Sequence, residues 1–177
     1  MDKHELAWYA LKVANGHVKC AILRRLNQMV LVDDTSFYHS PGGSKLHHNY
    51  RHGLVIHVNE VMQNVFAMTR DNPGDELITA VIWHDYMKTR DYKLDGETVL
   101  ETPYRKHIRH LAGSAMEFHA CAAPLVAREK LERIEHLLLS HHGRREWGSP
   151  VEPETADAHI LHAADRMSAE GVNIEPK

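Results

Sequence analysis

Apolar residues recur three and four positions apart along most of this chain, which is the spacing of α-helices that bury one face. The periodicity predicts helices over 4–14, 17–30, about 53–70, 75–85, 104–122, 124–142 and 154–169. Breaks fall at 15–16 and at the turn 71–74. Gly143 ends one helix, and Pro150 and Pro153 mark the loop before the last. The pattern therefore predicts an all-α fold.

Three stretches do not follow the helical period. Residues 33–53 contain paired aspartates, glycines and a proline, and we expect a loop-rich connection there. Residues 88–104 are charged and irregular, which favours an exposed loop. The run over 28–32 also suits a short strand, although no partner strand can be identified for it.

The length of 177 residues and the 43% hydrophobic content suit one domain with a substantial core. The 21 basic residues nearly balance the 24 acidic ones, and the pI near 6.6 argues against broad coating of nucleic acid. Cys20 and Cys121 form no CxxC motif, which is typical of free thiols in a reducing compartment. Because the sequence lacks a signal-type apolar core and a run of ~20 apolar residues, we expect a cytoplasmic protein without membrane contact.

The pair His84-Asp85 interrupts the apolar pattern, because it closes the most apolar run of the chain, 77–83. Adjacent polar side chains are costly to bury unless something binds them. Three other positions lie within or directly after apolar stretches: His57, the pair His141-His142, and Asp165. Imidazoles and carboxylates that converge from separate helices are the ligands of a transition-metal site.

Most of the 16 histidines need no such explanation, because a lone histidine on an apolar face is usually a core residue with a satisfied hydrogen bond. We assign that ordinary role to His4, His17, His39, His119 and His136. The combination of His57, His84-Asp85 and Asp165 differs, since burying these ionisable groups without a shared partner is unfavourable. The sequence therefore favours a metal-dependent hydrolase.

The order H…HD…D resembles the HD-domain metal-dependent phosphohydrolases. Longer segments extend the resemblance to the catalytic domain of YhaM-type 3′–5′ exoribonucleases. Residues 47–57 (HHNYRHGLVIH) are similar to the HHxYxGGLLEH segment of that branch, and residues 84–88 (HDYMK) to its HDxGK. Residues 140–155 resemble its SHHG…E-aromatic-GSP…PxT run. The resemblance covers roughly residues 37–169.

The resemblance implies a single HD-domain helical bundle over 1–177, with N-terminal helices and a loop over 1–46 and a metal-binding core over 47–169. The chain departs from the branch at His52, which replaces the first glycine of the GG pair, and at Met87, which replaces the glycine of HDxGK. We expect both changes to put bulk near the site. The N-terminal OB-fold of the full-length exoribonucleases has no counterpart in these residues.

Matched position by position, the resemblance implies two metal sites. The first would be held by His57, His84, Asp85 and Asp165, and the second by His110 and His141. His107 competes with His110 for its place, and His142 competes with His141. A bridging role suits Asp85, because a carboxylate has two oxygens where an imidazole has one free nitrogen.

Mixed nitrogen and carboxylate ligands favour one or two divalent ions among Mn²⁺, Fe²⁺, Co²⁺, Ni²⁺ and Zn²⁺ over Mg²⁺. Such an ion lowers the pKa of a bound water, and the resulting hydroxide would attack phosphorus in line with the leaving oxygen. Basic residues flank the metal motifs, where they would stabilise charge on phosphoryl oxygens. The expected catalytic residues are Asp85, Lys88 and Arg51, and the expected substrate contacts are His48, Arg109, Arg144 and His142. The ordinary alternative for these basic side chains is a solvated loop position.

The function that these features favour is hydrolysis of phosphate esters in nucleotides or at nucleic-acid 3′ ends. The expected substrate is a nucleotide or a short single-stranded nucleic acid, because the sequence has neither a basic stripe nor repeated stacking aromatics. Three alternatives stay open: a small mono- or triphosphate hydrolase without nuclease activity, an HD-type di-iron oxygenase, and a non-enzymatic module held together by metal. A homo-oligomer is compatible with a small helical enzyme of this kind.

Overall fold

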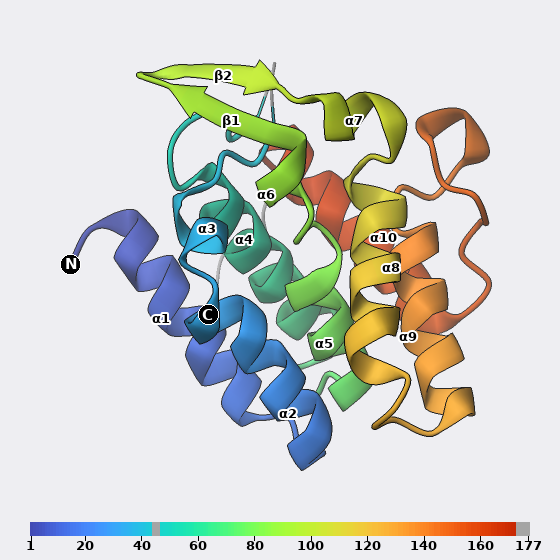
Figure 1. Cartoon of the computed structure of the whole chain (residues 1–177). Helices are drawn as coiled ribbons and strands as arrows, with labels where there is room; N and C mark the ends of the chain where they lie inside the picture. Colours follow the sequence, from blue (N-terminus) through green and yellow to red (C-terminus); the bar gives the residue numbers. More distant parts are fainter. Residues whose placement is uncertain (44–46, 173–177) are drawn as a thin grey trace.

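The computed structural model describes residues 1–43 and 47–172 and is built almost entirely of helices (Figure 1). The helices are α1 (Lys3–Gly16), α2 (Ala21–Gln28), α3 (Thr35–His39), α4 (Gly53–Met68), α5 (Asp75–Trp83), α6 (Lys88–Asp91), α7 (Pro103–His107), α8 (His110–Ala122), α9 (Arg128–Ser140) and α10 (Ala156–Glu170). A π-helical turn, η1 (Met29–Asp33), and a 3₁₀ turn, η2 (Arg145–Trp147), complete them. The predicted all-α class is confirmed. Residues 44–46 of the predicted loop and the last five residues of the predicted domain lie outside the described residues.

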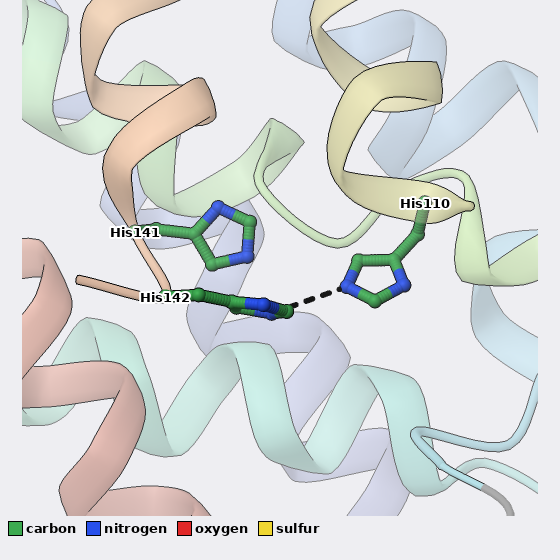
Figure 2. Close-up of side chains that lie close together, drawn as sticks. All are labelled: His110, His141 and His142. Atoms are coloured by element: carbon green, nitrogen blue, oxygen red, sulfur yellow. Dashed lines mark hydrogen bonds between the residues drawn. The ribbon is translucent and has the colours of Figure 1, made fainter. Parts of the chain in front are cut away.

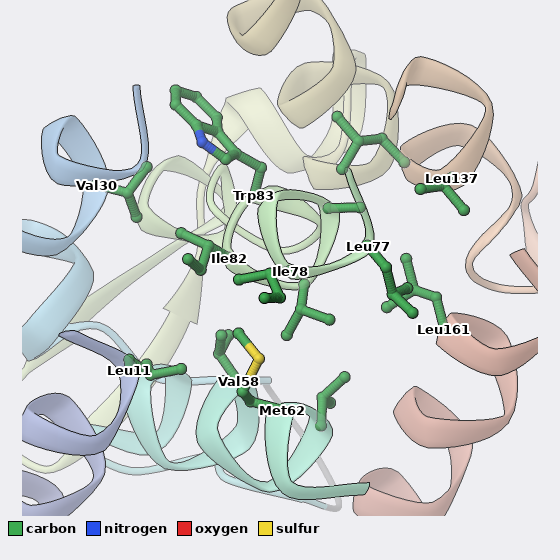
Figure 3. Packing of buried hydrophobic residues seen from close by; sticks show 14 of the residues in the cluster. Leu11, Val30, Val58, Met62, Leu77, Ile78, Ile82, Trp83, Leu137 and Leu161 are labelled. Atoms are coloured by element: carbon green, nitrogen blue, oxygen red, sulfur yellow. The ribbon is translucent and has the colours of Figure 1, made fainter. Parts of the chain in front are cut away.

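Helix α5 occupies the centre of the bundle, between α1 and α2 on one side and α8 and α9 on the other (Figure 1). Every residue from Leu77 to Trp83 is buried, and Figure 3 shows Val58 and Met62 of α4 against them. Full burial of each large aliphatic side chain stabilises the fold by about 1.5–3 kcal/mol. Because α5 is surrounded on all faces, the polar pair that follows it, His84-Asp85, is also buried.

The charged segment after α5 forms ordered structure, and its prediction as an irregular exposed loop is wrong. It contains α6 and an antiparallel hairpin of β1 (Tyr92–Asp95) and β2 (Thr98–Glu101), which lies across one end of the bundle in Figure 1. Gly96, at φ +58°, supplies the left-handed backbone that a tight hairpin turn requires. Asp91 and Tyr92 are buried where α6 joins β1.

Three other expectations are corrected. The 28–32 run is helical, because η1 continues α2 and buries Val30 and Leu31, and no described strand pairs with it. The loop-rich stretch 33–53 contains α3, whose first turn is capped by Asp34 accepting a hydrogen bond from the Ser36 backbone N–H at 2.7 Å. The predicted helix 104–122 is broken between α7 and α8.

The two departures from the exoribonuclease motifs lie in different surroundings. His52 adopts φ +68° before α4, donates from Nδ1 to the Tyr38 backbone oxygen at 2.8 Å, and stacks on His4. Its contacts therefore lie on the α1 and α3 side, and the expectation of bulk near the site is wrong for this residue. Met87 is buried, and its Cβ lies against Gly113 of α8. Within the described part of the chain, no helix is both long and apolar enough to span a membrane.

Candidate metal centre

Four predicted ligands form a first group at the end of α5 nearest the hairpin. His57 comes from the first half of α4, His84 and Asp85 follow α5 directly, and Asp165 lies on α10. One ligand atom from each lies within 4.8 Å of the others. His57 Nε2 is 3.0 Å from Asp85 Oδ2 and 3.1 Å from Asp165 Oδ1. His57, His84 and Asp85 are buried, and Asp165 is partly buried.

Three histidines form a second group beside the first. Figure 2 shows His141 and His142, from the end of α9, directed with His110, from the start of α8, toward one space. Their ligand nitrogens lie within 4.8 Å of one another, and His110 Nε2 is 3.3 Å from His142 Nε2. His107 is exposed at the end of α7, so the structure brings His110 and not His107 to this group. Both members of the His141-His142 pair belong to it.

Asp85 lies between the two groups and presents one oxygen to each. Oδ2 faces the first group, at 3.0 Å from His57 Nε2, whereas Oδ1 is 3.4 Å from His110 Nε2 and 3.8 Å from His141 Nε2. Both oxygens are buried and make no hydrogen bond of acceptable geometry with the described residues, although Lys88 Nζ approaches Oδ2 to 2.5 Å. This geometry suits a carboxylate shared by two cations.

The imidazoles of both groups share one hydrogen-bonding pattern, in which Nδ1 faces an acceptor and Nε2 faces the site. The acceptors are Ser168 Oγ for His57, Val81 O for His84, Asp91 Oδ2 for His110, Leu138 O for His141 and Trp147 O for His142, at 2.6–3.1 Å. An acceptor at Nδ1 holds the proton there and leaves the Nε2 lone pair free. The Nε2 of His141 is buried with no hydrogen-bond partner in the described structure.

The carboxylates and the cations of the first group stabilise one another. Burial disfavours the charged forms of Asp85 and Asp165. Lys88 and the surrounding imidazoles nevertheless hold the pKa of Asp85 well below its usual range, and His57 with the other imidazoles does the same for Asp165. Burial also opposes protonation of His57, yet hydrogen bonds to Asp165 and Asp85 raise its pKa to about 8. Burial lowers the pKa of Lys88, but the two carboxylates outweigh this and raise it.

The second group has the opposite electrostatic balance. Burial, followed by the neighbouring His142 and His84, lowers the pKa of His141. Burial and the nearby His110 lower the pKa of His142 to about 4. These two imidazoles are therefore neutral at pH 7, which is the form that binds a metal.

Of the predicted basic residues, only Lys88 contacts a member of either group through an ion pair in the described structure. Arg51 is exposed and has no described ion-pair partner. Arg109 is exposed before α8, and the Arg144 guanidinium lies 5.0 Å from the centre of the Trp147 ring. His48 contacts Glu60, with Nε2 3.0 Å from Oε2.

Four residues near the site were missed by reading the sequence. Asp91 accepts hydrogen bonds from His110 Nδ1 at 2.8 Å and from the His110 backbone N–H at 3.2 Å. Asp91 was not identified because the segment that contains it was interpreted as an exposed loop. Glu60 and Ser168 lie three residues after His57 and Asp165, a helical spacing that signals a shared face. Arg166, next to Asp165, lies over the Trp147 ring at 4.6 Å.

A pocket of about 240 Å³ opens beside both groups. It is lined by His142, Trp147, Asp165, Arg166, Ala169 and Glu170. Trp147 is 43% exposed, so a large part of its aromatic surface is accessible. Gly143, at φ +84°, makes the turn between α9 and this wall, and an added Cβ there would overlap the His162 ring. Only glycine fits this turn without displacing His162.

The donor set fits divalent transition metals. Imidazole nitrogens and carboxylate oxygens converge from five helices or their C-terminal ends, and Asp85 Oδ1 and His141 Nε2 are buried without a hydrogen-bond partner among the described residues. Native proteins rarely leave such atoms without a partner. A cation between these ligands would satisfy them and would remove the lone-pair repulsion between facing nitrogens such as those of His110 and His142.

Comparison with known proteins agrees with this geometry. The HD domain family model matches residues 54–170. The chain is 32% identical over 148 residues to the 3′–5′ exoribonuclease YhaM of Bacillus subtilis, covering 80% of this chain and 46% of that relative. The protein of the same name from Shouchella clausii is 30% identical over 173 residues, which cover 93% of this chain and 51% of the relative. The protein from Listeria welshimeri is 33% identical over 181 residues, which cover 98% of this chain and 55% of the relative.

The chain therefore belongs to the HD-domain family. It spans about half the length of the curated relatives it matches. No solved structure gives a significant match.

Proposed function

We propose that this chain removes nucleotides from the 3′ end of short single-stranded RNA by hydrolysing phosphodiester bonds with two divalent metal ions. The observation that carries the proposal is the shared orientation of five imidazoles, all with Nδ1 hydrogen-bonded and Nε2 directed at one buried carboxylate region. The names of the curated relatives supply the substrate class.

In this proposal the first metal is held by His57, His84, Asp85 and Asp165, and the second by His110, His141 and His142. Asp85 would contribute an oxygen to each site, because its two oxygens face different groups. His142, which the sequence predicted to be a substrate contact, is a metal ligand in this proposal. Its Nδ1 faces the Trp147 backbone oxygen and its Nε2 lies beside His110, which supports this assignment. Imidazole-rich sets of this kind favour manganese, iron, cobalt, nickel or zinc.

When bound, such ions polarise phosphoryl oxygens and lower the pKa of a coordinated water. The protein's own part is to orient the substrate and to balance charge. Lys88 places its ammonium against the first group, where its Nζ is 2.5 Å from Asp85 Oδ2. From that position the ammonium is directed at the negative charge that develops on the phosphoryl oxygens.

The pocket beside the metal groups provides a place for the terminal nucleotide. Trp147 presents an exposed ring for stacking on a base, and Arg166 and Arg144 supply positive charge close to it. Its volume of about 240 Å³ suits one nucleoside unit rather than a long strand. This small size also favours a second candidate substrate, a free nucleoside mono- or triphosphate.

The test is an assay of the purified chain with Mn²⁺, comparing a 5′-labelled single-stranded oligoribonucleotide with a panel of nucleotides. The proposal predicts a ladder of products shortened one nucleotide at a time from the 3′ end, abolished by EDTA. Phosphate release from nucleotides alone would select the second candidate. Oxygen consumption with iron and no phosphate-ester hydrolysis would contradict both and would favour an oxygenase.

A further inference from the structure

A hydrogen-bonded chain runs from the first metal group to the segment before α4. His57 Nδ1 is 2.9 Å from Ser168 Oγ, Ser168 Oγ donates to Glu60 Oε2 at 2.8 Å, and His48 Nε2 is 3.0 Å from the same oxygen. His57 and Ser168 are buried, and the side chains of His48 and Glu60 are only 11% and 14% exposed. Four side chains from three segments are thus connected in sequence.

The direction of every hydrogen bond in this chain is set by Glu60. An ionised carboxylate only accepts, so both Ser168 Oγ and His48 Nε2 must donate to it. Burial raises the pKa of Glu60, but hydrogen bonds from His48 and Ser168 outweigh this and lower it to about 2, so it is ionised near neutral pH. Once its hydroxyl proton points at Glu60, Ser168 offers only lone pairs to His57. His57 must then carry its proton on Nδ1.

We propose that Glu60 is a positioning residue that acts through Ser168 to hold His57 in the tautomer whose Nε2 binds metal. The inference rests on the proposed function, in that His57 is a proposed ligand. Glu60 follows His57 by one helical turn on α4, and Ser168 follows Asp165 by one turn on α10. The relay therefore joins the two helices that supply ligands to the first group.

His48 connects this relay to the segment before α4. His48 adopts φ +54°, and its backbone oxygen accepts from the Gly42 N–H at 2.8 Å. An added Cβ on Gly53 would overlap that oxygen, so the segment approaches the start of α4 as closely as glycine permits. This close packing fixes the backbone from which the His48 ring reaches Glu60.

The test uses three variants of the full chain. Ser168→Ala removes the acceptor of His57, and Glu60→Ala frees the Ser168 hydroxyl to donate to His57 instead. Ser140→Ala is the matched control, because Ser140 is equally buried and adjoins the proposed ligand His141, but its hydroxyl donates to the His136 backbone oxygen. The His57 tautomer is read from imidazole ¹⁵N NMR of the metal-free protein, assigned with His57→Gln, at a pH above the His57 pKa of about 8, where the ring is neutral. Mn²⁺ affinity is measured by calorimetry.

The proposal predicts a His57 proton on Nδ1 in the wild type and in Ser140→Ala, and a shift toward protonation on Nε2 in Ser168→Ala and Glu60→Ala. It also predicts a 10–100-fold weaker Mn²⁺ affinity in those two variants, with Ser168→Thr restoring it. An unchanged tautomer, or equal losses of affinity in all three variants, would overturn it. Because the tautomer is read without metal, a wild type that binds no metal would contradict the proposed function alone.

Discussion

The Nζ of Lys88 lies 2.5 Å from Oδ2 of Asp85, the carboxylate that stands between the two histidine groups. The ammonium offsets part of the negative charge that Asp85 and Asp165 concentrate in a buried region. A buried carboxylate without a cation would carry a large desolvation penalty. Lys88 thus offsets the cost of burying the carboxylates, and in the proposed function its positive charge would also stabilise a bound phosphoryl group.

Replacing Asp85 by alanine is expected to remove metal and activity together. Both proposed ions lose a shared ligand, so hydrolysis should fall by at least about 10³-fold, equivalent to several kcal/mol of transition-state stabilisation. Circular dichroism should still report a helical protein, and Asp33→Ala, which removes a surface carboxylate paired with Arg25, should behave like the wild type. Full activity of a metal-stripped Asp85→Ala protein would contradict this mechanism.

Lys88→Met is expected to lower kcat by about 10²–10³-fold while metal content stays at the wild-type level. The substitution keeps the length of the side chain and removes the charge that faces the developing phosphoryl anion. Steady-state kinetics and elemental analysis of the same preparation check the two parts. If the variant loses its metal instead, Lys88 has a structural role rather than a catalytic one.

Asp91→Asn is expected to weaken binding of the second metal by 10–100-fold, because Asp91 orients His110 through its Nδ1. The amide also weakens the contact with Arg105, which is 3.2 Å from the same oxygen. Asp95→Asn, at the end of β1, is the control. A Mn²⁺ titration should show one of two binding steps shifted to higher concentration in Asp91→Asn but not in Asp95→Asn. Identical isotherms for both variants would contradict a role of Asp91 in orienting His110.

Stability at acid pH is expected to depend on Glu60. Its folded pKa of about 2 lies below the ordinary value of 4.5, so ionisation stabilises the fold above pH 4.5, and this contribution is lost as the pH falls toward 2. The difference in unfolding free energy between the wild type and Glu60→Gln should therefore shrink across that window. Urea unfolding of the metal-free proteins at a series of pH values measures it. A difference that stays constant with pH would refute the assignment.

Trp147→Ala is expected to raise the KM for an oligoribonucleotide by about 5–150-fold, since stacking on a base contributes about 1–3 kcal/mol. The value of kcat should change little, because Trp147 does not belong to either ligand group. Tyr9→Ala removes an even more exposed aromatic ring from α1 and is the control. Equal KM values for the two variants would exclude the pocket as the nucleotide site.

The helical class and the first ligand group could be predicted from the sequence, because both follow from local signals. The helical spacing of apolar residues predicted that His57 faces the core. His84-Asp85 follows a run of seven mostly apolar residues, which indicated a helix buried in the centre of the fold. The hairpin was missed although the sequence carries a signal for it, because Tyr92–Asp95 alternates apolar and polar residues and leads into Asp95-Gly96. Its two strands are only four residues long, and the high charge of the segment favoured a loop. Asp91 was missed with it, because its burial depends on how α6 meets α8.

Choices between neighbouring histidines depended on tertiary geometry. His107 and His110 differ by three residues, and only the break between α7 and α8 buries one and exposes the other. His141 and His142 are adjacent, and the end of α9 with the turn at Gly143 lets both rings reach one group. The single-domain boundaries, the cytoplasmic location and a homo-oligomeric state stay predictions.

The central claim is that the two groups hold two metal ions that share Asp85. Elemental analysis of the chain after equilibration with excess Mn²⁺ and removal of free metal tests it most directly. The account predicts two equivalents in the wild type, one in His110→Ala and none tightly held in Asp85→Ala. One equivalent in both the wild type and His110→Ala, or no bound metal in the wild type, would contradict it.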